Sequence, residues 1–306
     1  MTPVLSVLQF AARHGRWLLV LGLVAGVALP GIAAFMEKQL PIAVALLLFF
    51  SALRVGPRQA FGATRDIGQS LYFVLALQLA LPIIFVLVLI ATDWRSPLAF
   101  GLALMLAASP ISGSPSLAIL LGKDSAPSLR LLIAGTALLP LTTIPVFWMM
   151  PDLVAGKSVL GAALRLLLII GIATAIAFVI RGFFLKNPGP AGLGAIDGLA
   201  ALTMAIMVVG LMAAVRPALE NNPGGLAFNL FIAFVANFGL QASVYLILKR
   251  PLPDQSAGIA VCAGNRNIAL FLAALPAGVM EPLLLFIGCY QVPMYLTPIL
   301  LRRFYR

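Results

Sequence analysis

Apolar stretches long enough to cross a lipid bilayer follow one another along almost the whole chain of 306 residues. A transmembrane helix needs about 20 consecutive apolar residues. Only 9% of the residues are charged, against roughly 25% in a soluble domain, so the sequence predicts an all-α polytopic membrane protein. Cutting the chain at charges and at proline and glycine clusters gives ten transmembrane segments, at 17–36, 39–54, 68–91, 97–122, 126–150, 158–182, 196–215, 225–248, 255–277 and 280–301.

Basic residues are concentrated on one side of this arrangement, and cytoplasmic loops typically carry such an excess of Lys and Arg. We therefore predict a multi-pass protein of the cytoplasmic (inner) membrane with both termini in the cytoplasm. The net charge of +11 follows from this topology, and no basic stripe indicates nucleic acid binding. The predicted inside residues are Arg13, Arg16, Arg54, Arg58, Arg65, Lys123, Arg181, Lys186, Lys249, Arg250, Arg302, Arg303 and Arg306, and the outside ones are Lys38, Arg95, Lys157 and Arg216.

The ten segments divide into two halves of five, near residues 149–158. Because five is odd, the halves enter the membrane in opposite directions, as in the inverted repeats of many secondary transporters. We predict repeats over 17–150 and 158–301. Pro110 and Gly264 are 154 positions apart, and Pro145 and Pro298 are 153 apart, which supports a repeat.

Two predicted segments contain residues that interrupt helices. The stretch 108–116 reads ASPISGSPS, and 263–267 reads AGNRN. A break at membrane depth frees backbone groups that lipid cannot satisfy, so it must be buried in protein or line a cavity. It also directs helix ends, with their partial charges, towards the contents of that cavity. We predict that the two breaks lie together and form a binding site.

Arg266 lies near the centre of the ninth predicted segment. An arginine there costs about 2.5–3.5 kcal/mol on insertion scales, and its guanidinium stays charged. The residues leave two compatible interpretations open. In the first, Arg266 is a fixed internal cation that donates to carbonyls freed by the other break. In the second, it attracts an anionic substrate.

Other polar side chains at membrane depth are candidates for the same pocket. Several also have ordinary structural explanations, since amides and hydroxyls join membrane helices and cap helix ends. No Asp or Glu lies at membrane depth, where carboxylates usually carry protons or bind sodium. The two cysteines, Cys262 and Cys289, are predicted to be buried and reduced. The polar candidates are Asn265, Asn267, Gln78, Ser112, Ser114, Asn237 and Gln291.

Motifs of enzymes are missing from the sequence. The single His14 excludes a multi-histidine metal site, and LGKD at 121–124 lacks the glycine that a phosphate-binding loop needs. We predict no enzymatic activity, no cofactor, and the lipid bilayer as a partner. The alternative to a secondary transporter is a protein of another functional class, either a passive channel or a membrane sensor. The sequence does not predict an oligomeric state.

Four stretches, ALQLALP, SPISGSPSLAILLGKDSAPS, GTALLPLTTIP and AGNRNIAL, resemble the bile acid:sodium symporter (BASS) superfamily, as in a divergent bacterial-type member. The resemblance covers almost the whole chain. It implies a secondary active transporter of a small organic anion that works by alternating access, usually with sodium. It also implies a panel of 17–36, 39–54, 158–182 and 196–215, beside a core of 68–91, 97–122, 126–150, 225–248, 255–277 and 280–301 in which the fourth and ninth helices cross at their unwound centres.

The resemblance implies a sodium site, and the sequence departs from the family there. Gln78, Ser114 and Ser128 match candidate sodium ligands, whereas Pro115 replaces an expected asparagine and Arg266 an expected glutamine. Since a fixed cation repels sodium, we expect Arg266 to take the place of the ion. A sodium-coupled organic anion symporter with a rearranged ion site is the alternative.

The predicted topology can be tested with reporter fusions. Green fluorescent protein fused after Arg306 should fluoresce, and alkaline phosphatase at the same position should be inactive, because that end is expected in the cytoplasm. Fusions within the predicted outside loop at Arg95 should give the reverse pattern. An active phosphatase after Arg306 would contradict the orientation.

Overall fold

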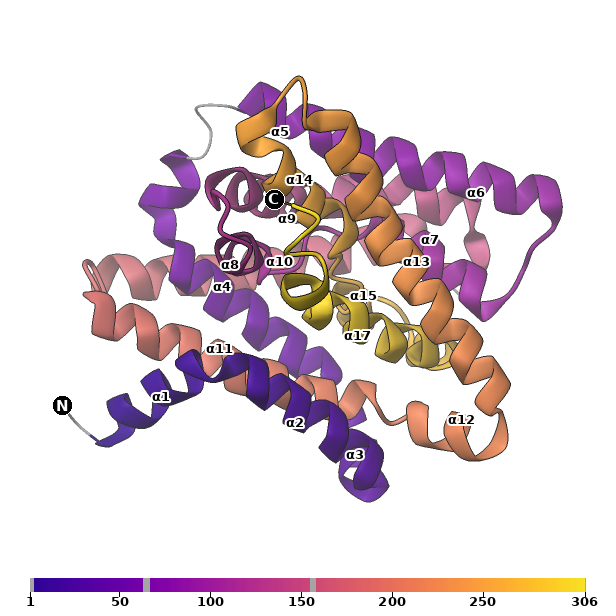
Figure 1. Ribbon diagram of the computed structural model, residues 1–306, viewed down its shortest axis with the longest axis horizontal. Helices are drawn as coiled ribbons and strands as arrows, with labels where there is room; N and C mark the ends of the chain where they lie inside the picture. Colours follow the sequence, from indigo (N-terminus) through magenta and orange to yellow (C-terminus); the bar gives the residue numbers. More distant parts are fainter. Residues whose placement is uncertain (1–2, 63–66, 155–157, 306) are drawn as a thin grey trace.

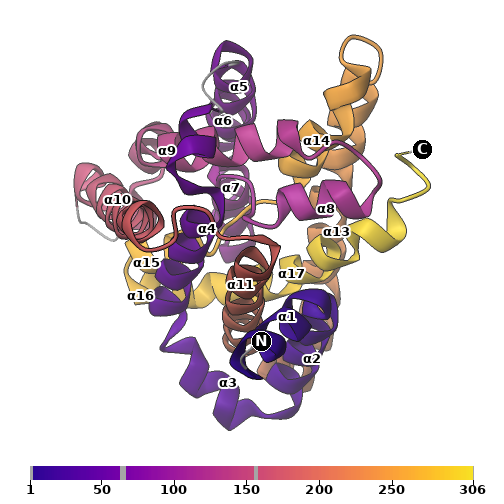
Figure 2. The same ribbon diagram turned by 90° about the vertical axis from the view of Figure 1, so that its left-hand side faces the viewer.

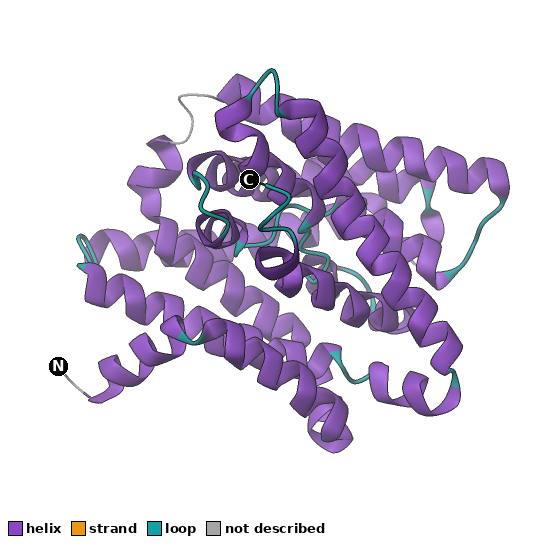
Figure 3. Ribbon diagram, in the orientation of Figure 1, coloured by secondary structure: helices purple, strands orange, loops and turns teal. Residues whose placement is uncertain are grey.

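Helices make up the regular structure of the chain (Figure 1, Figure 3). The computed structural model describes residues 3–62, 67–154 and 158–305, and no strand occurs in these ranges. The predicted all-α class is therefore confirmed. Of the basic residues used for the topology, Arg65, Lys157 and Arg306 lie outside the described residues.

The helices have the following bounds. They are α1 (Pro3–Arg13), α2 (Gly15–Ala28), α3 (Pro30–Glu37), α4 (Leu40–Gly62), α5 (Ile67–Val74), the π-helix η2 (Leu75–Ala80), α6 (Leu81–Thr92), α7 (Pro97–Ala107), α8 (Ser114–Leu120), α9 (Ala126–Met149), the 3₁₀ turn η3 (Pro151–Val154), α10 (Val159–Phe183), α11 (Pro190–Leu211), α12 (Val215–Asn221), α13 (Pro223–Leu248), α14 (Pro253–Gly264), α15 (Leu270–Ala274), α16 (Ala277–Met280), the 3₁₀ turn η4 (Glu281–Leu283) and α17 (Leu284–Leu300).

Within the described residues, 7 helices are long and apolar enough to cross a membrane, or up to 8 if a bent pair counts as one span. The bent pair is Val4–Arg13 and Trp17–Ala28, at 84° to each other. The chain is thus a multi-pass membrane protein. The seven helices are Leu40–Ala60, Gly68–Thr92, Ala126–Met149, Val159–Phe183, Pro190–Asn221, Pro223–Leu248 and Ala277–Leu300.

The first predicted segment, 17–36, is not one helix, so that prediction is wrong. It consists of α2 and α3, which are separated at Leu29 (φ −120°, ψ 73°). Pro30 explains the break, because the ring of a proline disfavours the α conformation in the residue before it. Pro30 itself occupies the first turn of α3, where its missing N–H is tolerated.

The second predicted segment, 39–54, is too short. The helix α4 continues to Gly62, with a kink at Gly56 (φ 71°) just before Pro57. Arg54 does not end the helix because its guanidinium forms an ion pair with Asp197 of α11, at 2.8 Å. A charge at the expected boundary is therefore held by a neighbouring helix.

The remaining segments agree with helices to within a few residues, apart from internal breaks. The segment 68–91 contains the π-helix, 196–215 starts earlier at Pro190, and 280–301 begins with the short η4 turn. The segments 97–122 and 255–277 are both interrupted, as the prolines and polar residues predict. These two interruptions define the candidate site.

Helix α11 is the centre of one packing group. Helices α1, α2, α3 and α4 pack along it, and α10 packs on α4 (Figure 2). Helices α13, α14 and α17 pack together in a second region, as do α5, α8, α9 and α14. In Figure 1, α1, α2, α3 and α11 lie on one side of the molecule, and α5, α6, α13 and α14 lie towards the other.

Glycines allow very close approach of α11 to its neighbours. A Cβ added at Gly198 would lie 2.0 Å from the backbone oxygen of Leu8 in α1, and one at Gly22 would lie 2.8 Å from the oxygen of Ala205. Real side chains do not occupy such distances, so the backbones would have to separate. Close backbone contact through small residues is a common basis of helix association in membranes.

Substitution of Gly198 by alanine should therefore destabilise the packing of α1 on α11. We expect Gly198→Ala to cost about 1–3 kcal/mol, as overpacking does in cores, and to lower the thermal unfolding midpoint in detergent. Gly171→Ala in α10 is the matched control, because a Cβ there meets nothing within 4 Å. Equal midpoints for the two variants would contradict the proposed contact.

Candidate functional site

The first interruption separates α7 from α8. Helix α7 ends at Ala107, and Ala108 is already extended (φ −67°, ψ 151°). Pro110 has no N–H with which to continue the helix. Helix α8 starts again at Ser114 with Pro115 in its first turn. Residues 108–113 are therefore unwound.

The second interruption separates α14 from α15. Helix α14 ends at Gly264, Asn265 is extended (φ −101°, ψ 90°), and helical structure resumes at Leu270. Here the side chain of Asn265 caps the preceding helix by donating to the Val261 carbonyl at 2.9 Å. Asparagine competes in this way with the helix for its own hydrogen bonds, which explains a break without a proline.

The two unwound segments pair with each other. Pro110 and Arg266 form an isolated antiparallel β-bridge. The Ile111 N–H donates to the Asn265 carbonyl at 2.9 Å, and the Asn267 N–H donates to the Ser109 carbonyl at 2.8 Å. Each break thus satisfies backbone groups that the other one exposes, as burial away from water requires.

Arg266 fills the centre of this crossing and is only 2% exposed. Its Nε donates to the Ala263 carbonyl at 2.7 Å, Nη1 to the Ala108 carbonyl at 3.0 Å, and Nη2 to the Leu77 carbonyl at 3.0 Å. Three of the five guanidinium N–H groups are therefore bound to backbone oxygens. No ion pair joins Arg266 to a carboxylate of the described residues.

Two of these three carbonyls lie at the C-terminal ends of helices. Ala108 follows α7, and Ala263 belongs to the last turn of α14. Each helix C-terminus carries a partial charge of about −0.5, so the two together supply roughly one negative charge. This accounts for a buried guanidinium that has no carboxylate beside it.

The third carbonyl is free because of Pro82. In the π-helix η2 each carbonyl accepts from the residue five positions later, as the Leu81 N–H does to Ala76. Leu77 would accept from position 82, but proline has no N–H. Nη2 of Arg266 supplies the missing donor.

The energies are consistent with a stable arrangement. Hydrogen bonds to charged groups contribute roughly 1.5–3 kcal/mol each, so three of them exceed the about 2.5–3.5 kcal/mol insertion cost of an arginine. The structure thus favours the fixed internal cation among the two interpretations of Arg266.

A second set of polar side chains supports the Asn265 side of the crossing. Asn237 Nδ2 donates to the Gly264 carbonyl at 2.6 Å, and Gln241 Nε2 donates to Asn237 Oδ1 at 2.6 Å. Thr297 of α17 donates to Asn265 Oδ1 at 3.3 Å. Asn237, Gln241 and Asn265 are fully buried, so these groups form one network from α13 to the break.

Gln78 and Ser128 contact the same region from the other side. Gln78 Nε2 donates to the Gly135 carbonyl and to Thr142 Oγ1, both at 2.9 Å, whereas Gln78 Oε1 has no partner among the described residues. Ser128 Oγ donates to the Gly258 carbonyl at 3.0 Å and so joins α9 to α14.

The remaining predicted residues are less closely involved. Ser114 is fully buried and its Oγ makes no hydrogen bond within the described chain, although the Cys262 thiol lies beside it. Ser114 therefore does not cap α8 with its side chain. Gln291 bonds to Ile287 and Tyr295 of its own helix. Ser112 and Asn267 are half-buried, and only the backbone of Asn267 takes part in the crossing.

Tyr290 belongs to the site and was not expected from the sequence. Its hydroxyl donates to the Gly264 carbonyl and accepts from the Arg266 N–H at 3.4 Å. Thr297 was missed as well. In an apolar helix a tyrosine usually packs against its neighbours, and a threonine usually donates to a carbonyl of its own helix. The one signal in the sequence is that Tyr290 and Thr297 are seven positions apart, which places them on the same face of α17.

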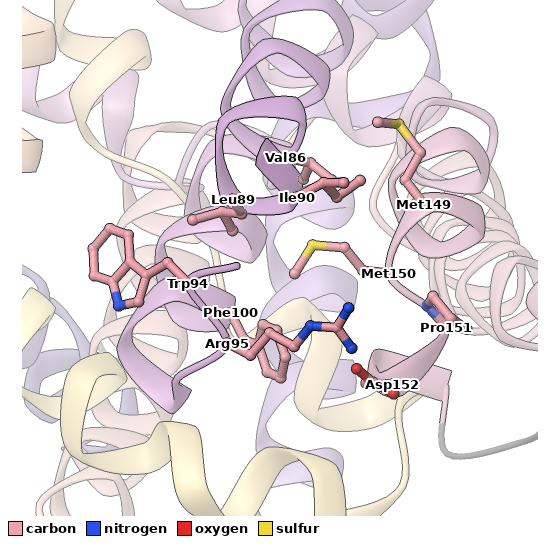
Figure 4. Close-up of a pocket in the computed structure, with 10 residues that line it drawn as sticks. All are labelled: Val86, Leu89, Ile90, Trp94, Arg95, Phe100, Met149, Met150, Pro151 and Asp152. Carbon is pink, nitrogen blue, oxygen red and sulfur yellow. The ribbon is translucent and has the colours of Figure 1, made fainter. Parts of the chain in front are cut away.

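A separate cavity of about 140 Å³ lies between α6, α7, α9 and η3 (Figure 4). Most of its lining residues are apolar, and Arg95 and Asp152 point towards each other at one side. Arg95 also pairs with the exposed Asp93 at 2.9 Å. None of the predicted site residues lines this cavity, so it is separate from the crossing.

Cys262 and Cys289 are free and buried, as predicted. In the described part of the chain no three His, Cys, Asp or Glu residues lie together in a way that could hold a metal ion. The donors available at the crossing are amides, hydroxyls and backbone carbonyls. No known protein-family model matches this chain, and no curated protein matches it either.

Removal of the guanidinium should destabilise the crossing. Arg266→Met leaves three buried carbonyls without donors, and we expect a loss of about 3 kcal/mol or more, because each buried acceptor left unsatisfied costs roughly 1–3 kcal/mol. Arg266→Lys should be intermediate, because an ammonium lacks the planar fork of donors. Thermal unfolding in detergent would measure both.

The control for this series is Arg95→Ala. Arg95 and its partner Asp93 are largely exposed, so their ion pair should contribute at most about 1 kcal/mol. An Arg266→Met variant as stable as Arg95→Ala would contradict the role assigned to Arg266.

Proposed function

We propose that this protein is a secondary active transporter of a small organic anion, similar to members of the bile acid:sodium symporter superfamily. The observation that carries the proposal is the crossing of two unwound segments that are buried among membrane helices. Secondary transporters typically bind substrate and coupling ions where discontinuous helices expose their ends and freed backbone groups. We further propose the inner membrane as its location, with both termini in the cytoplasm.

A common register in the two halves supports an inverted repeat of ten transmembrane segments. Three pairs of helices begin 156 positions apart, and in each pair the helices have matching places around the breaks. The pairs of first residues are Ile67 and Pro223, Pro97 and Pro253, and Ser114 and Leu270. The bridge partners Pro110 and Arg266 also differ by 156 positions.

The distribution of polar contacts supports a panel and a core that move against each other. The ion pair between Arg54 and Asp197 lies within the panel, and the bonds around Arg266 lie within the core. Neither set joins the panel to the core. Helix α15 of the core packs on α4 and α10 of the panel.

Arg266 supports a mechanism that does not use sodium at the crossing. The C-terminal ends of discontinuous helices are typical ligands of Na⁺ in transporters, and here these ends bind a guanidinium. A second cation in the same place would be repelled by it, whereas the two N–H groups not used by the three carbonyls can donate to an anion. We propose that Arg266 takes the place of a coupling cation.

A sodium-coupled symporter with a rearranged ion site is the second candidate. It is favoured by Gln78 Oε1 and Ser114 Oγ, which are buried oxygens without hydrogen-bond partners in the described residues. Such oxygens can bind a hard cation. In this case Gln78→Ala and Ser114→Ala would each abolish sodium dependence.

Uptake into proteoliposomes distinguishes the two candidates. We expect saturable uptake of at least one member of a library of small organic anions, and an unchanged rate when an inward Na⁺ gradient is replaced by choline. Arg266→Gln should lose uptake or acquire dependence on a cation, with folding checked by thermal unfolding. Arg95→Ala is the control and should transport normally.

Two outcomes would contradict the proposal. If no anion is transported by folded protein, the organic anion class is wrong. If a sodium gradient drives accumulation in the native protein, and Arg266→Gln leaves both affinity and ion dependence unchanged, the role given to Arg266 is wrong.

A further inference from the structure

The short segment after α17 places a fully buried tyrosine against the network of the second break. Residues 301–305 form turns rather than a helix, and Arg302, Arg303 and Phe304 are exposed. Tyr305 is 0% exposed. Segments beyond the last helix are usually loosely held, so a fully buried side chain in one calls for an explanation.

The phenol of Tyr305 enters between helices of the core. Its hydroxyl donates to Gln241 Oε1 at 3.0 Å, and its ring packs edge-on against Tyr245, with centroids 4.9 Å apart. It belongs to the same buried apolar cluster as residues 259–263 of α14 and Leu121, which follows α8. Tyr305 therefore occupies the space beside both half-helices on one side of the crossing.

Tyr305 is also the outer end of the hydrogen-bond network at the second break. From Gln241 the network continues to Asn237, and from Asn237 to the Gly264 carbonyl. Three side chains, those of Tyr305, Gln241 and Asn237, thus link the exposed segment after α17 to the unwound backbone at Gly264. A water path along this network would first meet Tyr305.

The attachment of the segment is slight. Among the described residues, the bond from the Tyr305 hydroxyl is the only hydrogen bond by which residues 302–305 hold the helices, since their backbone bonds go to Leu301. The aromatic contacts of Phe304 and Tyr305 with Tyr245 complete the contact. Such a side chain can leave without unwinding a helix.

We propose that Tyr305 is a removable plug that closes the crossing to water from the face where α13 ends. Its departure would leave a space larger than the roughly 30 Å³ share of one water molecule, with Gln241 Oε1 free to accept a hydrogen bond from water. The role of the plug rests on the proposed function, because Tyr305 would close one side of the protein during an alternating-access cycle. Its structural content can be tested without transport.

The native cysteines provide the measurement. Cys262 lies in the same buried cluster as Tyr305. Cys289 lies in a different buried cluster, on α17. Cys289→Ala leaves Cys262 as the reporter of access at the plug, and Cys262→Ala leaves Cys289 as the reporter of general loosening.

Each single-cysteine protein would be labelled with N-ethylmaleimide in lipid nanodiscs, where the reagent reaches both faces. We expect Tyr305→Ala to accelerate labelling of Cys262 by about tenfold or more, through local opening, and to leave Cys289 unchanged. Tyr305→Phe keeps the ring and should label near the native rate, and Tyr305→Leu should fall between them. Arg303→Ala is the matched control, because Arg303 is exposed in the same segment, and it should have no effect.

If Tyr305→Ala does not fold, the other two variants still test the proposal. Cys262 should then be labelled more slowly in Tyr305→Phe than in Tyr305→Leu. An unchanged Cys262 rate in the folded variants would overturn the proposal. Equal acceleration of both cysteines would also overturn it, since that indicates a structural residue. Failure of anion uptake with this labelling pattern intact would remove the proposed function and leave the plug.

Discussion

The contact between the Arg266 guanidinium and three backbone carbonyls is the interaction on which the centre of the molecule depends. Two broken helices in a membrane protein expose carbonyls that lipid cannot satisfy. A buried arginine needs acceptors for a charge it cannot lose. Each requirement is unfavourable alone, and together they satisfy each other at Ala263, Ala108 and Leu77.

This arrangement explains why the polar residues of the chain are gathered where they are. Asn237, Asn265 and Tyr290 bind the groups of the second break that Arg266 does not reach. Gln78 joins η2 to α9, and Ser128 joins α9 to α14. Away from the crossing, helices of the first packing group meet largely through glycines and apolar side chains, with the Arg54–Asp197 ion pair joining α4 to α11. The fully buried polar side chains are thus concentrated where the backbone is irregular.

Much of this was predictable from the sequence, because breaks and buried charges have local causes. Pro110 and the polar run around Arg266 predict two interruptions, and the structure has both. The all-α class follows from the long apolar stretches. The first predicted helix is interrupted although the apolar pattern continues through Leu29, because Pro30 disfavours the α conformation in the residue before it.

The rest depends on tertiary contacts that no local pattern reveals. That Arg266 reaches Leu77, 189 positions away, requires the chain to fold first. Tyr290 and Thr297 read as ordinary members of an apolar helix, and Tyr305 reads as a residue of a basic tail. Their importance comes from which freed carbonyl or amide lies opposite them. Sequence periodicity contains no information about that.

Pro82 helps to hold the guanidinium of Arg266 in place, although it forms no hydrogen bond with any group of the crossing. By withholding one N–H it keeps the Leu77 carbonyl available. Any other residue at position 82 would offer an amide proton to that oxygen, and Arg266 would then compete for its acceptor with the helix itself. The binding of the Arg266 guanidinium therefore depends partly on Pro82, a residue whose sequence context suggests only a helix kink.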